Sequence, residues 1–150
     1  MTSSPWLRAI PLVAVLLLVL DAIWLVAVAS PLYDAELGER MAASPDLVAG
    51  GLFYVLYVVA LAHFAVVPGL RADRAVREVA RDGGLLGLTA YGTWALTNKA
   101  VLADWPAALV PVDIVWGAVL SATVSVVAVV AGRAWGRAAG RAADVPAGRG

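Results

Sequence analysis

Four long apolar segments divide the chain, and shorter polar stretches separate them. Each is close to the ~20 residues that an α-helix needs to cross a ~30 Å hydrocarbon core. In lipid the backbone must satisfy its own hydrogen bonds, which favours helices. The segments span about 9–29, 47–67, 83–103 and 109–131. They predict an all-α, four-helix transmembrane bundle in one domain over residues 1–135, and an Ala/Gly/Arg-rich, disordered tail over residues 136–150.

The composition supports a membrane protein and excludes several kinds of site. Of the 150 residues, 62% are apolar and 15% are charged, against roughly 45–50% and 25% in soluble domains. The chain has no Cys and one His, which excludes disulfides and a His-rich metal site within one chain. It has no Gly-rich phosphate loop, zinc-ligand spacing or nucleic-acid motif. We therefore expect no metal, no cofactor and no nucleic-acid partner.

The first apolar segment imitates a cleavable signal peptide, because Arg8 precedes it and residues 27–29 (AVA) look like a cleavage site. Its length favours a retained helix, since the core of a signal peptide is only about 7–15 residues long. Asp21 within the segment and Pro31 just beyond it also argue against cleavage. We expect the helix to be retained.

The polar stretches along the chain are alternately rich and poor in basic residues. The stretch after the first helix has only Arg40 against four acidic residues, and the turn after the third helix has Asp104 and no base. The basic stretches are the N-terminus, the loop after the second helix and the tail, with Arg8, Arg71, Arg74, Arg77, Arg81, Arg133, Arg137, Arg141 and Arg149. The positive-inside rule then predicts a multi-pass protein of the cell (inner or plasma) membrane, N-in and C-in.

The loop after the second helix also has a second interpretation. Its arginines recur at helical spacing, which suits binding to anionic lipid headgroups. Asp73, Glu78 and Asp82 lie among them, however, and dilute the positive charge. This mixture favours a solvated helix extension with ion pairs.

Polar side chains within the helices gather in the extracytoplasmic half of the predicted bundle. At ~1.5 Å per residue, Asp21 falls slightly beyond the midplane and Asp113 about one turn below the outer surface. Spacings of three or seven residues place the polar and aromatic side chains of each helix on one face. The predicted ligand-binding residues are Asp21, Trp24, Tyr54, Tyr57, Tyr91, Thr97, Asn98, Lys99, Asp113 and Trp116.

Two carboxylates and one ammonium share this region, and a charge in the membrane usually faces the bundle interior with a partner. Lys99 and Asp113 are the easier pair, because a short turn joins their helices. Asp21 is then left with Tyr hydroxyls, Asn98, a Trp indole N–H or a proton. Lys99 has an alternative, which is to extend to the membrane surface.

Two further patterns concern helix ends and helix contacts. Aromatic residues that suit anchoring at the membrane interface are Trp6, Tyr33, Trp105 and Trp135. Small residues spaced by four let helix backbones approach closely in lipid. They are Gly83 and Gly87 on the third helix, and Gly117, Ser121 and Ser125 on the fourth.

An ordered set of motifs resembles a family of small bacterial four-span integral membrane proteins, which is catalogued as a domain of unknown function and described as predicted membrane proteins. The motifs are Asp21-x-x-Trp24-Leu25, Phe53-Tyr54-x-x-Tyr57, Tyr91-Gly92-Thr93, Leu96-Thr97-Asn98, Trp105 and Asp113-x-x-Trp116-Gly117. The resemblance covers roughly residues 5–131 and implies four membrane helices in a bacterial inner membrane. It implies no activity.

The chain departs from this pattern at two places. Trp94-Ala95 stands where the family tends to have Tyr-Asp, and Lys99 stands where an apolar residue usually follows the Asn. The lost acid and the gained base shift the local charge by about two units. Any role that depended on that acid is in doubt here.

Three kinds of function fit these residues. The first is a protein that binds or helps to move a small polar ligand or a lipid headgroup. The second is a membrane-lipid enzyme with Asp21 or Asp113 as acid/base, which the lack of an obvious nucleophile, metal cluster or cofactor motif disfavours. The third is a structural or accessory subunit whose polar residues only join helices. The lipid bilayer is the expected environment, and an oligomer or a partner subunit is compatible with the sequence.

Overall fold

The protein is all-helical throughout the part described by this computed structural model, residues 4–143. Its α-helices are α1 (Pro5–Trp24), α2 (Ser30–Leu37), α3 (Leu47–Leu61), α4 (Val67–Arg71), α5 (Val76–Val101) and α6 (Leu109–Ala143). Two π-helical turns, Leu25–Ala29 and Ala62–Val66, join α1 to α2 and α3 to α4, and a 3-10 turn, Gly38–Arg40, follows α2. The predicted all-α fold is therefore confirmed.

Three continuous helical stretches in the described chain are long and apolar enough to cross a membrane. They are Pro5–Arg40, Leu47–Arg71 and Leu109–Ala142. Helix α5 does not meet the same criterion, since glycines, hydroxyl residues and charges lower its hydropathy. With 26 residues, it is nevertheless ~39 Å long and packs along α6. The result is a helical membrane bundle in which α5 is the least apolar member.

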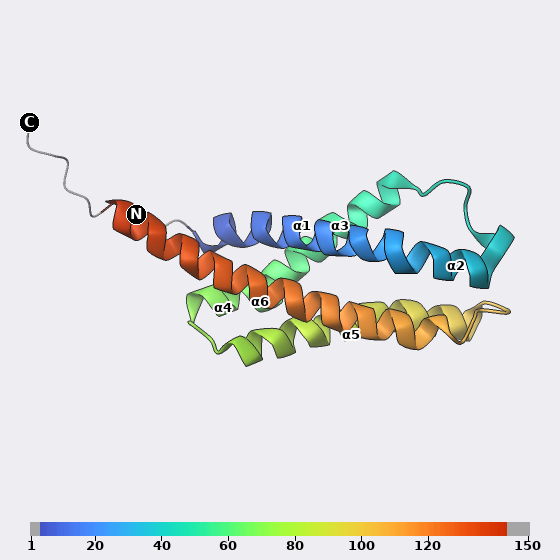
Figure 1. Ribbon diagram of the computed structural model, residues 1–150. Coiled ribbons are helices and arrows are strands. Elements are labelled where there is room, and N and C mark those ends of the chain that lie inside the picture. Colours follow the sequence, from blue (N-terminus) through green and yellow to red (C-terminus); the bar gives the residue numbers. More distant parts are fainter. Residues whose placement is uncertain (1–3, 144–150) are drawn as a thin grey trace, which may run out of the picture.

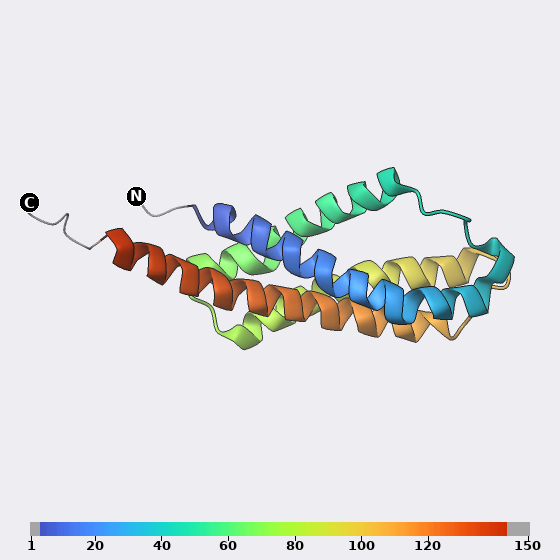
Figure 2. The same cartoon turned by 45° about the horizontal axis from the view of Figure 1, so that its top comes forward.

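The bundle is elongated, and both ends of the described chain lie at one end of it (Figure 1). Helices α5 and α6 run antiparallel, and α1 continues through its π-helical turn into α2. The first half of α3 diverges from the other helices in both Figure 1 and Figure 2. Asp46 caps this helix, since its carboxylate accepts hydrogen bonds from the backbone N–H of Val48 (2.9 Å) and Ala49 (3.0 Å).

The helices extend beyond the segments predicted from hydropathy, because charged ends and π-helical turns continue them into the polar stretches. The predicted 9–29 helix becomes 5–40, the 47–67 helix reaches 71, and the 83–103 helix begins at 76 and ends at 101. Helix α6 runs to residue 143, so the first part of the tail predicted to be disordered is helical. Residues 144–150 of that tail lie outside the described part of the chain.

The apolar core lies between α1, the end of α3, α4 and α6. On α1 the buried residues recur every four positions, Ala9, Val13, Leu17 and Asp21, and they form one stripe along the helix. The first three are fully buried apolar side chains. Asp21 is the fourth member of that stripe, so the helix that builds the core also carries a carboxylate into the bundle.

Small residues allow α5 and α6 to approach closely. A Cβ atom added at Gly83 would lie 2.7 Å from the Ser121 carbonyl oxygen, and one added at Gly87 would overlap the backbone of Gly117. A Cβ added at Gly117 would overlap the ring of Tyr91. The contact predicted from the four-residue spacing of small side chains is therefore formed.

Candidate functional site

Asp21 is held by two aromatic donors from other helices. The Tyr54 hydroxyl on α3 donates to one carboxylate oxygen at 2.6 Å, and the Trp116 indole N–H on α6 donates to the other at 3.1 Å. The Asp21 side chain is only 5% exposed. Of the partners predicted for it, a Tyr hydroxyl and a Trp indole are present, and together they connect α1, α3 and α6.

Trp24 and Trp116 form one aromatic wall beside Asp21. Their rings are stacked with centroids 4.2 Å apart and planes inclined by 6°. Trp24 follows Asp21 by three residues on α1, so both side chains face the same direction, as the spacing predicts. The stack fixes the Trp116 ring that donates to Asp21.

Asp113 does not pair with Lys99, contrary to the prediction. Its carboxylate instead accepts a 2.6 Å hydrogen bond from the Tyr33 hydroxyl on α2. The Lys99 ammonium donates to the backbone carbonyl of Trp105 at 2.8 Å. The turn between α5 and α6 brings this carbonyl within reach of Lys99 and so offers the ammonium a closer acceptor. Lys99 therefore binds the turn and lies apart from the carboxylates.

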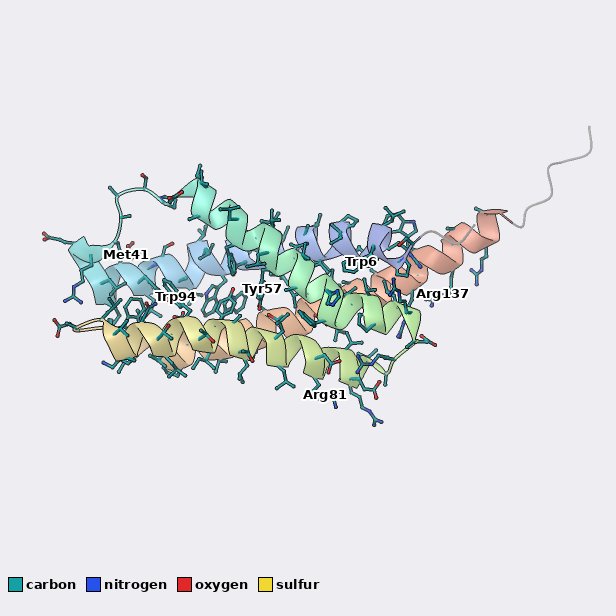
Figure 3. All side chains as sticks on the ribbon, turned by 180° about the vertical axis from the view of Figure 1, so that it is seen from behind. Trp6, Met41, Tyr57, Arg81, Trp94 and Arg137 are labelled. Atoms are coloured by element: carbon teal, nitrogen blue, oxygen red, sulfur yellow. The ribbon has the colours of Figure 1, made fainter. Side chains whose placement is uncertain are left out.

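A cavity of about 260 Å³ lies beside both carboxylates. Helices α1, α2, α5 and α6, the first π-helical turn and the chain after α2 all contribute to its wall. The lining residues are Asp21, Trp24, Leu25, Ala29, Ser30, Tyr33, Met41, Tyr91, Trp94, Asp113 and Trp116. Figure 3 shows Met41 and Trp94 at one end of the bundle and Arg81 and Arg137 at the other. The cavity is thus a polar and aromatic chamber remote from the basic end.

Half of the predicted ligand-binding residues line this cavity: Asp21, Trp24, Tyr91, Asp113 and Trp116. Tyr54 supports Asp21 from α3. The buried Tyr57 shares a 2.7 Å hydrogen bond with the Ser121 hydroxyl and packs edge-on against Tyr91.

Three predicted ligand-binding residues from the end of α5 lie outside the cavity. The Thr97 hydroxyl donates to the Thr93 carbonyl of its own helix. The Asn98 side-chain nitrogen is buried and has no hydrogen-bond partner in the described chain. Lys99 binds the α5–α6 turn, as above. The predicted site therefore divides into a cavity and a separate polar helix end.

Tyr33 lines the cavity, although the sequence predicted it to be an anchor at the membrane interface. It lies twelve residues after Asp21, and on a regular α-helix the two side chains would point ~120° apart. The π-helical turn Leu25–Ala29 absorbs about one extra residue and reduces this angle to ~20°. Tyr33 thus joins the Asp21 face, and only knowledge of the π-helical turn would have predicted it.

Trp105 was also predicted to be an interfacial anchor, but its side chain is only 8% exposed. Its ring packs edge-on against Trp94, with centroids 6.1 Å apart. Because Trp94 lines the cavity, Trp105 supports one of the cavity walls. The α5–α6 turn therefore folds back onto the site.

The opposite end of the bundle carries a network of arginines. Arg8 donates to the Gly132 carbonyl at 3.0 Å, and Arg133 donates to the Arg74 carbonyl at 2.7 Å. Arg74 also forms a 2.7 Å ion pair with Asp82. Burial raises the pKa of Asp82, but hydrogen bonds from Arg81 and Arg74 outweigh it and hold the pKa below its ordinary value. The basic stretches thus meet at one end, where Arg74 and Arg81 of the loop form ion pairs with Asp82.

The fold and this cavity define a helical integral membrane protein with two buried carboxylates, Asp21 and Asp113, beside one cavity. The chain belongs to the family described as "Predicted membrane protein (DUF2177)", whose family model matches residues 6–130. The resemblance seen in the sequence motifs is therefore confirmed over most of the chain. No curated protein and no solved structure matches the chain significantly.

Proposed function

We propose that this protein binds, or helps to move, a small polar ligand or a lipid headgroup in the extracytoplasmic half of the cell membrane. The observation that supports this proposal is the chamber of about 260 Å³ beside Asp21 and Asp113. Aromatic walls with a few convergent polar groups are typical of ligand pockets, and ionisable residues inside a membrane mark functional sites by default.

The proposed orientation follows from the positions of the charges. Arg8, Arg133 and the arginine loop lie together at the end opposite the chamber. The positive-inside rule puts that end in the cytoplasm, so the chamber opens to the other side. A ligand would then enter from the extracytoplasmic space or from the outer leaflet.

An accessory structural role is the second candidate, and the Asp21 hydrogen bonds favour it. The carboxylate receives one donor from α3 and one from α6, as expected of a group that joins helices. Such bonds are worth roughly 0.6–2 kcal/mol each in membrane bundles. This role explains Asp21 but leaves the cavity between Asp113 and the aromatic walls without a use.

A cavity-filling substitution separates the two roles. Ser30 lines the chamber, so Ser30→Phe should occupy it and leave both Asp carboxylates with their donors. Ala27→Phe is the matched control, because Ala27 is exposed and does not line the chamber. Thermal unfolding of the purified protein is measured with phosphatidylglycerol, phosphatidylethanolamine, glycerol and small amines.

If the chamber is a binding site, at least one of these probes stabilises the wild type and Ala27→Phe, and Ser30→Phe loses that shift. Stabilisation that survives in Ser30→Phe contradicts binding in the chamber. If no probe stabilises any of the three proteins, the structural role is the better account of the polar residues.

A further inference from the structure

We propose that the chamber recognises an organic ammonium group, and this inference rests on the proposed binding function. The chamber combines two carboxylates with three Trp and two Tyr side chains, and no basic residue lines it. This is the chemistry that binds substituted ammonium ions, which aromatic faces attract and carboxylates neutralise.

The charge of the chamber is unbalanced within the described chain. Arg40 and Lys99 are the basic residues at this end of the bundle. Arg40 donates to the Asp104 carbonyl at 3.0 Å, and Lys99 donates to the Trp105 carbonyl at 2.8 Å. Both cations are thus bound to the α5–α6 turn, which leaves the chamber to be neutralised by a proton or a cationic ligand.

Asp21 shows that an aromatic N–H of the chamber already serves as a donor to a carboxylate. The Trp116 indole N–H has no acceptor capacity, and it donates to Asp21. Acidic side chains inside a membrane bundle usually face a partner there, and a cationic ligand would be such a partner for the chamber.

Asp113 offers the free acceptor that an ammonium needs. Its side chain is 7% exposed and lines the chamber. One carboxylate oxygen accepts from Tyr33 at 2.6 Å. The other oxygen accepts no hydrogen bond from the described residues, although a carboxylate has about four acceptor positions. This oxygen is the expected contact for the ligand.

The aromatic faces supply the rest of the recognition. Trp24 and Trp116 cover each other on one side, and both also line the chamber. Trp94 and Tyr91 line it from α5. A cation within about 6 Å of the centre of such a ring is attracted to its face, and the attraction is stronger where water is excluded.

Choline and its neutral analogue 3,3-dimethyl-1-butanol test the charge directly, since the two have nearly the same shape. Binding is measured by isothermal titration calorimetry on the full chain in phosphatidylglycerol nanodiscs. Choline should bind at least about tenfold more tightly than the alcohol. Asp113→Asn and Trp94→Leu should each weaken choline binding by about tenfold or more. Trp135→Leu is the control, because Trp135 is an exposed residue outside the chamber.

Nanodiscs that also contain phosphatidylethanolamine identify the source of the ammonium. If the physiological ligand is a lipid headgroup, this lipid should compete with choline, and if the ligand is a free amine, choline binding should be unchanged. Equal binding of choline and the alcohol, or unchanged choline binding in folded Asp113→Asn, would overturn the ammonium assignment. A neutral or anionic probe that binds in a Ser30-dependent way would still support the chamber as a site.

Discussion

Asp21 and Asp113 are the same residue type in the same half of the bundle, yet their surroundings give them different tasks. Asp21 has a donor on each carboxylate oxygen, from Tyr54 and Trp116, and so it holds helices together. Asp113 has a single donor, Tyr33, and retains acceptor capacity toward the chamber. At the residue scale, Asp21 joins helices, and under the proposed function Asp113 is the carboxylate left to contact the ligand.

The choice of partners shows what residue-level reasoning can and cannot predict. Loop charges and helical spacing suffice to predict that Asp21, Trp116 and Asp113 lie toward one end of the bundle. The level of each residue depends only on its position along its helix and on the direction of that helix. The partner of Lys99 depends on the path of a short turn, which hydropathy does not encode. That turn presents the Trp105 carbonyl, and Lys99 binds it instead of a carboxylate.

Gly117 is a position where an added methyl group should disturb the packing beside the chamber. A Cβ atom there would overlap the ring of Tyr91, which lines the chamber. Gly117→Ala should therefore lower the free energy of unfolding by about 1–3 kcal/mol, as overpacking does in other cores. The measurement is reversible unfolding of the purified protein in mixed micelles.

Gly50→Ala provides the comparison, because no atom lies within 4 Å of a Cβ added at Gly50. That variant should be neutral or slightly stabilising, since Ala favours a helix over Gly by up to ~1 kcal/mol. Equal losses in both variants would contradict the assignment of the Gly117 effect to contact with Tyr91.

At the scale of elements, the π-helical turn Leu25–Ala29 decides which face α2 presents. Without it, Tyr33 would point away from Asp113 and the chamber would lose one wall. Hydropathy predicts that a helix exists here, because the apolar run is long, but it cannot locate a change of helical phase. The segment predicted over 47–67 likewise begins where α3 begins, at Leu47. Hydropathy did not reveal the π-helical turn Ala62–Val66 within that segment.

A one-residue deletion tests this role of the π-helical turn. Deleting Val26, which is 77% exposed, should convert the turn to regular α-helix. Tyr33 would then lie eleven residues after Asp21, or ~20° away on an α-helix, so the two residues would keep a common face. We expect the deletion variant to fold and to lose no more than about 1–2 kcal/mol of stability, which is the scale of one altered hydrogen bond.

Deleting Val15 is the matched control, because Val15 is also exposed (61%) but lies within the regular part of α1. That deletion turns Ala9 and Val13 by ~100° relative to Leu17 and breaks the buried stripe. Several kcal/mol of core packing should be lost. Thermal unfolding and size-exclusion profiles compare the two, and equal disruption by both deletions would contradict a compensating role for the turn.

At the scale of the whole molecule, the bundle separates charge from polarity along its long axis. All arginines of the described chain except Arg40 lie toward the end that carries both described chain ends, and the chamber occupies the other (Figures 1 and 3). This asymmetry could be predicted from the sequence because it depends on the total number of basic residues in each polar stretch. It does not depend on the hydrogen-bond or ion-pair partner of any single residue. The dimensions of the chamber could not, since they depend on how α2 folds against α5 and α6.

The orientation of this axis can be measured directly, since the chain has no cysteine and each introduced thiol is the only one. Ala43 and Ala72 are exposed residues in the polar stretches after α2 and α4, at opposite ends of the bundle. In intact cells, a membrane-impermeant maleimide should label Ala43→Cys and spare Ala72→Cys, because the positive-inside rule predicts that the arginine-rich second stretch lies in the cytoplasm. After lysis both variants should react equally, which controls for accessibility of the thiols. Labelling of Ala72→Cys alone in intact cells would reverse the axis, place the chamber on the cytoplasmic side and restrict its ligands to those available there.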